Sequence, residues 1–436
     1  TMYHGEIKIF ARTASPRLKY IAGLIFGNIL GSDWKIITYK NQIGDDPVIN
    51  YSSEEIPGSV SIKPHQLLFE NGIKTILPYV GEWKGIPAFF LTDENSDIPF
   101  DIFAASFFLT TRYEEYLTYK PDMHGRFPAQ ASLASRNNFL RIPVVDLWAK
   151  VLADILERHF PDLVFRKDGY KALLTIDLDQ PFAYLGRNFS RITGLMFRDI
   201  VIRPRIAVER FRVLSGREKD PYDVFGYLIS CIENTGTDVR FFAPAGRITK
   251  YDKNPSWRNK DYSRLLKEIS SKYSAGIHPS YFATDDYSVF NEEKNRLGII
   301  LEKEITISRF HFLRLKIPSY YNMLEKAGIV EDYSMGYADE PGFRAGTARP
   351  FMFYNLPEER QTGLRIIPLQ VMDATLYQYM KLDPEEAGKV VFSIISETRK
   401  VGGLFVSLWH NTSLTGNKER DGWRKLFEKM LLIQKP

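Results

Sequence analysis

The second half of the chain alternates short apolar runs with longer amphipathic segments. From Ala172 onward, seven runs rich in β-branched and aromatic residues predict strands, and segments such as YSRLLKEISSKY and PEEAGKVVFSIISETRKVG predict helices between them. The seven runs are ALLTIDLD, DVRFFAP, AGIHPSY, ITISRFHFL, AGIVEDYS, LRIIPLQVMD and GGLFVSLWHN. Strands that alternate with helices favour a parallel sheet. Because polar residues gather at the carboxyl end of strand after strand, we favour a β/α barrel over a doubly wound sheet.

The first half mixes its elements differently. Residues 101–117 and 144–160 have the apolar spacing of helices, whereas WKIITYK, residues 34–40, predicts a short strand. A long amphipathic helix ends before the pattern changes, which indicates a domain boundary. We therefore expect a smaller α/β domain at residues 1–165, followed by a barrel domain at residues 166–436.

Composition narrows the class of protein. The 436 residues are 44% hydrophobic, and 58 basic against 53 acidic residues give a net charge of +5, which is too small an excess to indicate nucleic-acid binding. The single cysteine, Cys231, excludes a disulfide within the chain and a thiolate zinc cluster, so we expect a cytoplasmic protein. The opening residues lack a signal-peptide pattern, and the apolar residues 18–31 are too few to span a bilayer. We expect no integral membrane segment, and the oligomeric state stays open.

Two aspartates close the first strand of the second half. In LLTIDLDQP, Asp177 and Asp179 stand at i and i+2, so both side chains lie on the same face of the strand. At the carboxyl end of a barrel strand, that face points into the mouth where active sites form. Two neighbouring carboxylates stay ionised there only if a cation lies between them or a proton is shared. A metal ion is the simplest solution.

Further polar residues end the later strands. Three histidines, His278, His311 and His410, fall at predicted strand ends, and imidazole nitrogens with carboxylate oxygens are ordinary ligands of zinc and its first-row neighbours. Arg309 is placed to pair with a carboxylate, and Asp332 is placed to orient a histidine. Each of these residues has a structural alternative, as a turn cap or a hydrogen-bonded core residue. Their recurrence on successive strands favours a common site.

The order of these residues resembles the NodB-homology polysaccharide deacetylases. That pattern has aspartates on the first strand, His on the third, Arg on the fourth, Asp on the fifth and LWH on the last; TIDLDQP stands where the family usually reads TFDDG. The segments SIKPHQLLFE, PFDIFAASFFLTTRYEEY and DYSMGYADEPGFRAGTARPF extend the likeness over nearly the whole chain, to a branch with an extra N-terminal α/β domain. The resemblance implies a distorted seven-stranded β/α barrel. It also implies a divalent metal, zinc being favoured, and removal of N- or O-linked acetyl groups from sugars in surface-polysaccharide metabolism.

The resemblance implies a role for each matching residue. These are the general base Asp177, the metal ligands Asp179 and His278, the arginine that braces the base, Arg309, the acid that tunes the general acid, Asp332, and the general acid His410. In the implied mechanism the metal polarises the acetyl carbonyl and activates water, Asp177 accepts a proton, and His410 protonates the leaving amine or alkoxide.

The chain departs from the family pattern at Phe282. This residue stands four positions after His278, where the family has its second histidine ligand, and a phenyl ring cannot bind a metal. We expect His311 to complete the site, with two alternatives: a metal bound weakly through two side chains, or His311 paired with a carboxylate in a metal-free network. The spacing between the first and third strands also leaves an insertion at residues 182–225 that we expect to act as a lid.

Residues near the expected mouth are candidates for contacting a sugar. They are Tyr281, Tyr337, Phe343, Arg344 and Trp409, with Trp409 equally suited to packing inside the barrel. The first domain is expected to be non-catalytic, to dock on the barrel or shape its groove, and to present TTRYEEYLTYKPDMHGRF as an exposed helix end and loop. Two other functions stay open: a catalytically silent carbohydrate-binding protein, and a structural role in which the rim residues form buried salt bridges.

Overall fold

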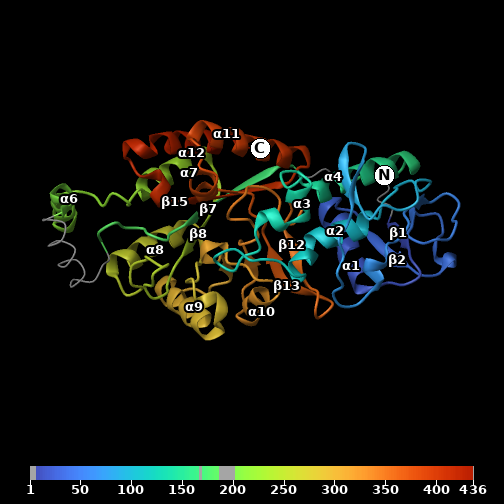
Figure 1. Cartoon of the computed structure of the whole chain (residues 1–436), viewed down its shortest axis with the longest axis horizontal. Coiled ribbons are helices and arrows are strands. Elements are labelled where there is room, and N and C mark those ends of the chain that lie inside the picture. The colour runs from blue at the N-terminus through green and yellow to red at the C-terminus, as the bar shows by residue number, and fades with distance from the viewer. Residues whose placement is uncertain (1–5, 166–168, 186–201, 436) are drawn as a thin grey trace.

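The structure is a computed structural model that describes residues 6–165, 169–185 and 202–435. The molecule is elongated, with the N-terminal strands and helices at one end and the C-terminal two thirds of the chain at the other (Figure 1). Within these ranges, no helix has both the length and the apolar content that crossing a membrane requires.

A small parallel sheet forms the N-terminal end of the molecule. Its four strands lie in the order β2-β1-β3-β4. Their bounds are β1 Ile7–Phe10, β2 Trp34–Ile37, β3 Val48–Asn50 and β4 Val60–Ser61. A separate hairpin joins β5 (Val80–Trp83) to β6 (Ile86–Phe89), and the helices here are α1 (Pro16–Ala22), α2 (Ile102–Thr110), α3 (Leu133–Arg136) and α4 (Val144–His159). The expected α/β character of this half is therefore present.

A larger, mostly parallel sheet forms the rest of the chain. Its nine strands lie in the order β12-β13-β11-β10-β9-β8-β7-β15-β14, and only the β12–β13 pair is antiparallel. The strands are β7 Lys171–Asp177, β8 Asp238–Ala243, β9 Ser274–Ile277, β10 Ile307–Ser308, β11 Glu331–Asp332, β12 Phe351–Asn355, β13 Arg360–Ile366, β14 Val371–Met372 and β15 Leu404–His410. The expectation of parallel strands alternating with helices is correct.

The expected distorted, seven-stranded barrel is not confirmed, because the hydrogen-bonded sheet of the described residues is not closed. Across the described residues, β12 and β14 are edge strands of an open ladder. Irregular backbone lies between the two edges: the Leu369 N–H donates to Met335, just after β11, and the Gln370 N–H donates to Val406 in β15. Pro368 interrupts the run LRIIPLQVMD, so this run forms two separate strands, β13 and β14, instead of one.

Helices cover the larger sheet on both sides. In Figure 1, α11 and α12 run along one side of the strands, and α8, α9 and α10 lie along the opposite side. The bounds are α6 Pro204–Leu214, α7 Phe225–Thr235, α8 Lys260–Lys272, α9 Tyr287–Leu301, α10 Ser319–Lys326, α11 Pro384–Lys400 and α12 Asp421–Ile433. The strands β7 and β8 are buried along most of their length, as expected of parallel strands covered on both faces.

The apolar core is continuous between the two sheets. A single buried cluster includes Ile9 of the small sheet, Trp148 of α4 and Trp409 of β15. Polar contacts cross the same boundary, because the Asp146 carboxylate of α4 accepts a hydrogen bond from the Ala348 N–H at 2.9 Å. The position of one half is therefore fixed on the other.

A buried carboxylate ties the small sheet to α2. Asp101 is the N-cap of α2, where Oδ1 accepts from the Ala104 N–H at 2.9 Å. Its Oδ2 accepts from the Tyr51 hydroxyl and from the His65 N–H, both at 2.6 Å. Burial raises the pKa of Asp101 from 3.8 to about 6.

Asp101 should make stability depend on pH in a definite direction. Because its pKa is higher in the folded chain, the folded state binds more protons than the unfolded state between pH 3.8 and about 6. The free energy of unfolding should then fall as pH rises through this interval, by about 3 kcal/mol in total. The Asp101→Asn side chain does not titrate. The free energy of unfolding of the parent protein minus that of the variant, measured with urea, should therefore fall between pH 4 and pH 6. A difference that is constant with pH would contradict the prediction.

Candidate active site

Strand register places the first polar residues of the site. In the parallel β7–β15 pair, His410 lies opposite Asp177, at the carboxyl end of both strands. Asp179 follows Asp177 by two residues, and both line one cavity, as do Leu408 and His410. The intervening Trp409 points to the other face, where its ring packs edge-on against Phe427 of α12.

His278 follows β9 and turns one nitrogen toward the two aspartates. Its Nδ1–H donates to the Arg309 carbonyl at 2.7 Å, which leaves Nε2 as the atom that faces the site. The Nε2 atom lies 2.9 Å from Asp179 Oδ1 and 3.8 Å from Asp177 Oδ2. His278 is almost completely buried.

His311 lies in a tight turn after β10, over His311–Leu313. Its Nδ1–H donates to Asp252 Oδ1 at 2.8 Å, and its Nε2 lies 3.3 Å from Asp179 Oδ2. The next two residues, Phe312 and Leu313, have φ of 60° and 49°. Left-handed backbone costs a residue with a side chain about 1–2 kcal/mol, so this turn is strained where it presents His311.

These three side chains suit a divalent cation. The ligand atoms of Asp179, His278 and His311 all lie within 4.8 Å of one another, the one such group of three in the described part of the chain. Among the described residues, the buried Asp179 Oδ1 and His278 Nε2 make no hydrogen bond, although they lie 2.9 Å apart. Both histidines direct Nδ1 to another acceptor, as metal-ligating histidines do. The donor set of one carboxylate and two imidazoles therefore fits a zinc-like ion.

Charge complementarity is strong around Asp179. Burial alone would raise the pKa of Asp179, but His311 and His278 hold it well below its usual value. Burial alone would lower the pKa of His311, but the carboxylates of Asp179 and Asp252 raise it to about 9. The Asp179 carboxylate is thus compensated by two histidines that follow strands β9 and β10.

Asp373 holds His410, and Asp332 does not. The His410 Nδ1–H donates to Asp373 Oδ1 at 2.7 Å, and the His410 backbone N–H donates to Asp373 Oδ2 at 2.8 Å. Burial alone would lower the pKa of His410, but the Asp373 carboxylate raises it to about 10. Asp332 instead accepts from the Ser334 N–H and hydroxyl, both at 2.9 Å, and burial raises its pKa to about 7. Asp332 thus does not hydrogen-bond to His410 as expected, and Asp373 does, because β14 pairs with β15 and Asp373 directly follows β14.

Arg309 lies behind Asp177. Its Nε is 3.9 Å from Asp177 Oδ1, and its guanidinium lies over the Phe242 ring at 4.9 Å. None of its side-chain nitrogens hydrogen-bonds to another described residue, and burial lowers its pKa, with the charges of Asp177 and Asp332 opposing this. Arg309 therefore supplies positive charge next to Asp177 without a direct hydrogen bond.

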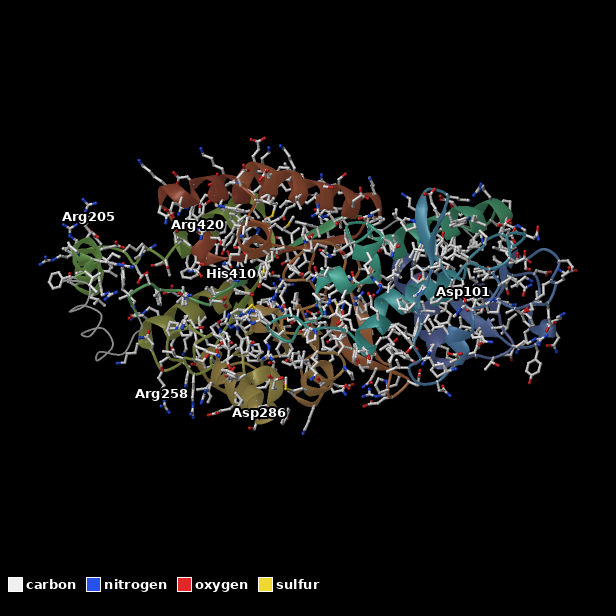
Figure 2. The ribbon with its side chains drawn as sticks, viewed as in Figure 1. Asp101, Arg205, Arg258, Asp286, His410 and Arg420 are labelled. Carbon is white, nitrogen blue, oxygen red and sulfur yellow. The ribbon has the colours of Figure 1, made fainter. Side chains whose placement is uncertain are left out.

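The polar groups open into a cavity of about 250 Å³. Its volume is below the roughly 300–1,000 Å³ typical of pockets for drug-sized ligands, so it fits a small group. Its aromatic lining comes from the loops around the site: Tyr251, Phe310, Phe312, Tyr377 and Tyr379. Figure 2 labels His410 among the strands of the larger sheet, in the part of the molecule away from Asp101.

The residues expected to contact a sugar lie outside this lining. Trp409, Tyr337, Phe343 and Arg344 are all buried, and none of them lines the cavity. Tyr281 lies next to the cavity, where its ring stacks on Tyr251 with centroids 3.8 Å apart. Tyr281 is buried as well. Strand alternation turns Trp409 away from the cavity, and a long loop carries Tyr337, Phe343 and Arg344 toward the N-terminal half.

That loop contacts a buried network of charged residues in the segment TTRYEEYLTYKPDMHGRF. This segment was expected to be an exposed helix end and loop. Glu115 accepts from Arg112 Nε at 2.7 Å and from Arg344 Nε and Nη2 at 2.9 and 2.7 Å. Arg112 also donates to Glu114 at 2.8 Å and to the Tyr337 hydroxyl at 2.9 Å. All five residues are buried, because the second half covers this end of the helix.

The insertion expected to form a lid is described in part. Residues 186–201 lie outside the described ranges, and none of the described residues 202–225 lines the cavity. Helix α6 of this insertion lies at the far end of the molecule (Figure 1). Phe282, which we expected to occupy the position of a second histidine ligand, is 49% exposed.

Two residues of the site were missed in the sequence. Asp373 ends the apolar run LRIIPLQVMD, so its strand-end position was a usable signal. Asp252 lies in the irregular loop after β8, far from a strand end, where it holds His311 and accepts from the Tyr281 N–H at 2.9 Å. No periodic pattern marks such a loop residue.

The chain matches one family in its N-terminal half and resembles solved structures at low sequence identity. Residues 7–161 match a family described as a family of unknown function, DUF7033. Among curated proteins, none matches the sequence. A crystal structure of a Mycobacterium smegmatis protein described as a candidate polysaccharide deacetylase aligns at 12% identity over 62% of this chain and 86% of its own, with a TM-score of 0.40.

Two further crystal structures align over a similar part of the chain. A polysaccharide deacetylase from Bacillus cereus has 12% identity over 62% of this chain and 86% of its own, with a TM-score of 0.29. A CE4 family pseudoenzyme from Bacillus anthracis has 9% identity over 61% of this chain and 63% of its own, with a TM-score of 0.30.

Close strand packing beneath His278 should make Gly276 intolerant of a side chain. A Cβ atom at Gly276 would lie 2.5 Å from Ile307 Cγ1 and 2.6 Å from the Ile307 carbonyl oxygen, in the neighbouring strand β10. We expect Gly276→Ala to lower the free energy of unfolding by about 1–3 kcal/mol through this overpacking. Gly363→Ala in β13 is the matched control, since no atom lies within 4 Å of its Cβ position. Equal urea midpoints for the two variants would contradict the prediction.

Proposed function

We propose that the protein is a metal-dependent hydrolase that removes an N- or O-linked acetyl group from a carbohydrate in surface-polysaccharide metabolism, acting in the cytoplasm. One observation carries the proposal. A group of one carboxylate and two imidazoles, with ligand atoms within 4.8 Å of one another, shares a cavity with Asp177, whose Oδ1 accepts no hydrogen bond from the described residues, and with His410, which is held by Asp373. A metal-ligand set beside a base and an acid is the arrangement that hydrolysis of an acyl group requires.

Asp179, His278 and His311 would hold the metal, and zinc is the favoured ion. A bound divalent ion acts as a Lewis acid toward a carbonyl oxygen and lowers the pKa of bound water. His311 thus replaces the ligand that Phe282 cannot supply. Asp252 and the Arg309 carbonyl fix the two imidazoles so that Nε2 of each faces Asp179.

Asp177 is the proposed general base. Its side chain lines the cavity, and its Oδ1 accepts no hydrogen bond from the described residues, so the carboxylate keeps the capacity to accept a proton from an attacking water. Arg309 Nε, 3.9 Å from Asp177 Oδ1, places positive charge beside this carboxylate.

His410 is the proposed general acid. The His410 Nδ1–H donates a hydrogen bond to Asp373, so the proton on Nε2 is the one directed toward the cavity. There His410 Nε2 lies 3.6 Å from Asp179 Oδ2. It would protonate the leaving amine or alkoxide of the sugar. Asp373 replaces Asp332 as the carboxylate that supports this role.

Two features support a sugar as the substrate. The order of the site residues along the chain resembles the carbohydrate deacetylases, and the cavity is lined by aromatic rings that suit contact with sugar rings. The small cavity fits one substituted ring better than several. We further propose that residues 1–165 form an accessory domain and residues 166–436 the catalytic one.

Metal loading is the direct test of the site. We expect zinc to bind the purified protein with one ion per chain, as measured by calorimetry after treatment with a chelator. Asp179→Ala and His278→Ala should each weaken binding at least about tenfold, because each removes one of three protein ligands. Glu268, which lies on the exposed face of α8, provides a control variant, Glu268→Ala, with unchanged affinity. Equal zinc affinity in all four proteins would contradict the assignment.

Activity separates an enzyme from a silent binding protein. The zinc-loaded protein should release acetate from N- or O-acetylated sugars, and chelation should abolish the release. Asp177→Asn and Asp373→Asn should each lower kcat about 10²–10⁴-fold while zinc affinity stays within a few-fold, because these residues act on protons. Sugar binding without acetate release across a panel of acetylated sugars would instead identify a carbohydrate-binding protein.

A further inference from the structure

A loop from the N-terminal half contributes Arg126 to the lining of the cavity. Arg126, which follows Asp122 in the segment DMHGR, lines the cavity beside His311. Its side chain is buried, and its Nε donates to Asp122 Oδ2 at 2.7 Å. The other two nitrogens of the guanidinium donate across the cavity rim to residues of the larger sheet's loops.

These two hydrogen bonds join separate loops of the site. Arg126 Nη1 donates to the Phe312 carbonyl at 2.7 Å, and Nη2 donates to the Tyr379 hydroxyl at 3.2 Å. Phe312 directly follows His311 in the left-handed turn, and Tyr379 ends the short helical segment Thr375–Tyr379 after β14. A planar guanidinium is suited to this task, because its donors are fixed in one plane.

The same loop makes further contacts with the turn. The His124 ring lies 4.9 Å from the Phe312 ring, centre to centre, and the His124 carbonyl accepts from Arg314 Nε at 3.0 Å. The N-terminal half therefore contacts the turn through the Phe312 carbonyl and ring, and it contacts the Arg314 side chain just after the turn. The imidazole of His311 is held separately, through Nδ1, by Asp252.

We propose that Arg126 is a positioning residue that holds the strained His311 turn, so that the N-terminal half completes the metal site of the other half. The inference rests on the proposed function, because it takes His311 as a metal ligand. The Phe312 and Leu313 backbone is in a conformation that residues with side chains rarely keep unless their surroundings impose it. The hydrogen bond to the Phe312 carbonyl supplies such a constraint one residue from the ligand.

The test measures zinc affinity by calorimetry and the visible absorption spectrum of the cobalt-loaded protein. Arg126→Ala should weaken zinc binding about 10- to 100-fold, the usual effect of losing a residue that orients a ligand. Its cobalt spectrum should shift toward that of His311→Ala. In the His311→Ala background, the same Arg126→Ala replacement should leave zinc affinity unchanged, because the ligand that it positions is gone.

Control variants separate positioning from general damage to the fold. Arg141→Ala removes an exposed arginine of the same half, which pairs with Glu340 at 3.2 Å, and should change neither readout. Tyr379→Phe removes only the weaker of the two rim hydrogen bonds and should leave zinc affinity nearly unchanged. Arg126→Lys keeps the charge beside Asp122 but cannot make both hydrogen bonds, to the Phe312 carbonyl and the Tyr379 hydroxyl. It should also weaken zinc binding, and it serves as the test if the alanine variant does not fold.

The outcomes distinguish the positioning role of Arg126 from the proposed metal-dependent function. If the parent protein binds no zinc, the metal site and the positioning role are both overturned. If the parent binds zinc and neither Arg126 variant weakens it, only the positioning role is overturned. An Arg126→Ala effect that persists undiminished in the His311→Ala background also overturns it, because the arginine would then act on the whole fold.

Discussion

The carboxylate of Glu115 is the contact on which the arrangement of the two halves depends. It accepts from Arg112 of its own half and from Arg344 of the other, and all three side chains are buried. Without this carboxylate, the buried Arg344 would lose its ion pair and Arg112 would be left with Glu114, a loss of compensation that costs several kcal/mol. The network thereby fixes the N-terminal half on the larger sheet, and the loop that carries Arg126 reaches the cavity as a result.

Much of the second half could be predicted from its pattern. Apolar runs ending in polar residues located the strands, and the i, i+2 spacing of Asp177 and Asp179 predicted their common face. His278 and His311 were also predicted as partners of Asp179, because carboxyl ends of neighbouring parallel strands meet at one edge. The geometry brings these four side chains together within the cavity. Local order in the chain was enough to define this part of the site.

The remainder depends on contacts that no local pattern encodes. Asp252 reaches His311 from an irregular loop, and the open ladder follows from backbone around Leu369 that hydrogen-bonds outside any regular strand. The burial of Arg112 is a tertiary effect, since its charge favoured an exposed position when considered alone. In contrast, Trp409 was predictable: a residue between Leu408 and His410 must point away from the face that they share.

The register of β7 against β15 has a consequence for how this chain can change over time. Asp177 and His410 face each other because every residue pair along the two strands is matched, from Lys171 opposite Leu404 to the carboxyl ends. A single residue inserted into or deleted from either strand would turn one of these side chains from the cavity to the opposite face. Length variation among descendants of this sequence should therefore collect in the connecting loops and be absent from these two strands.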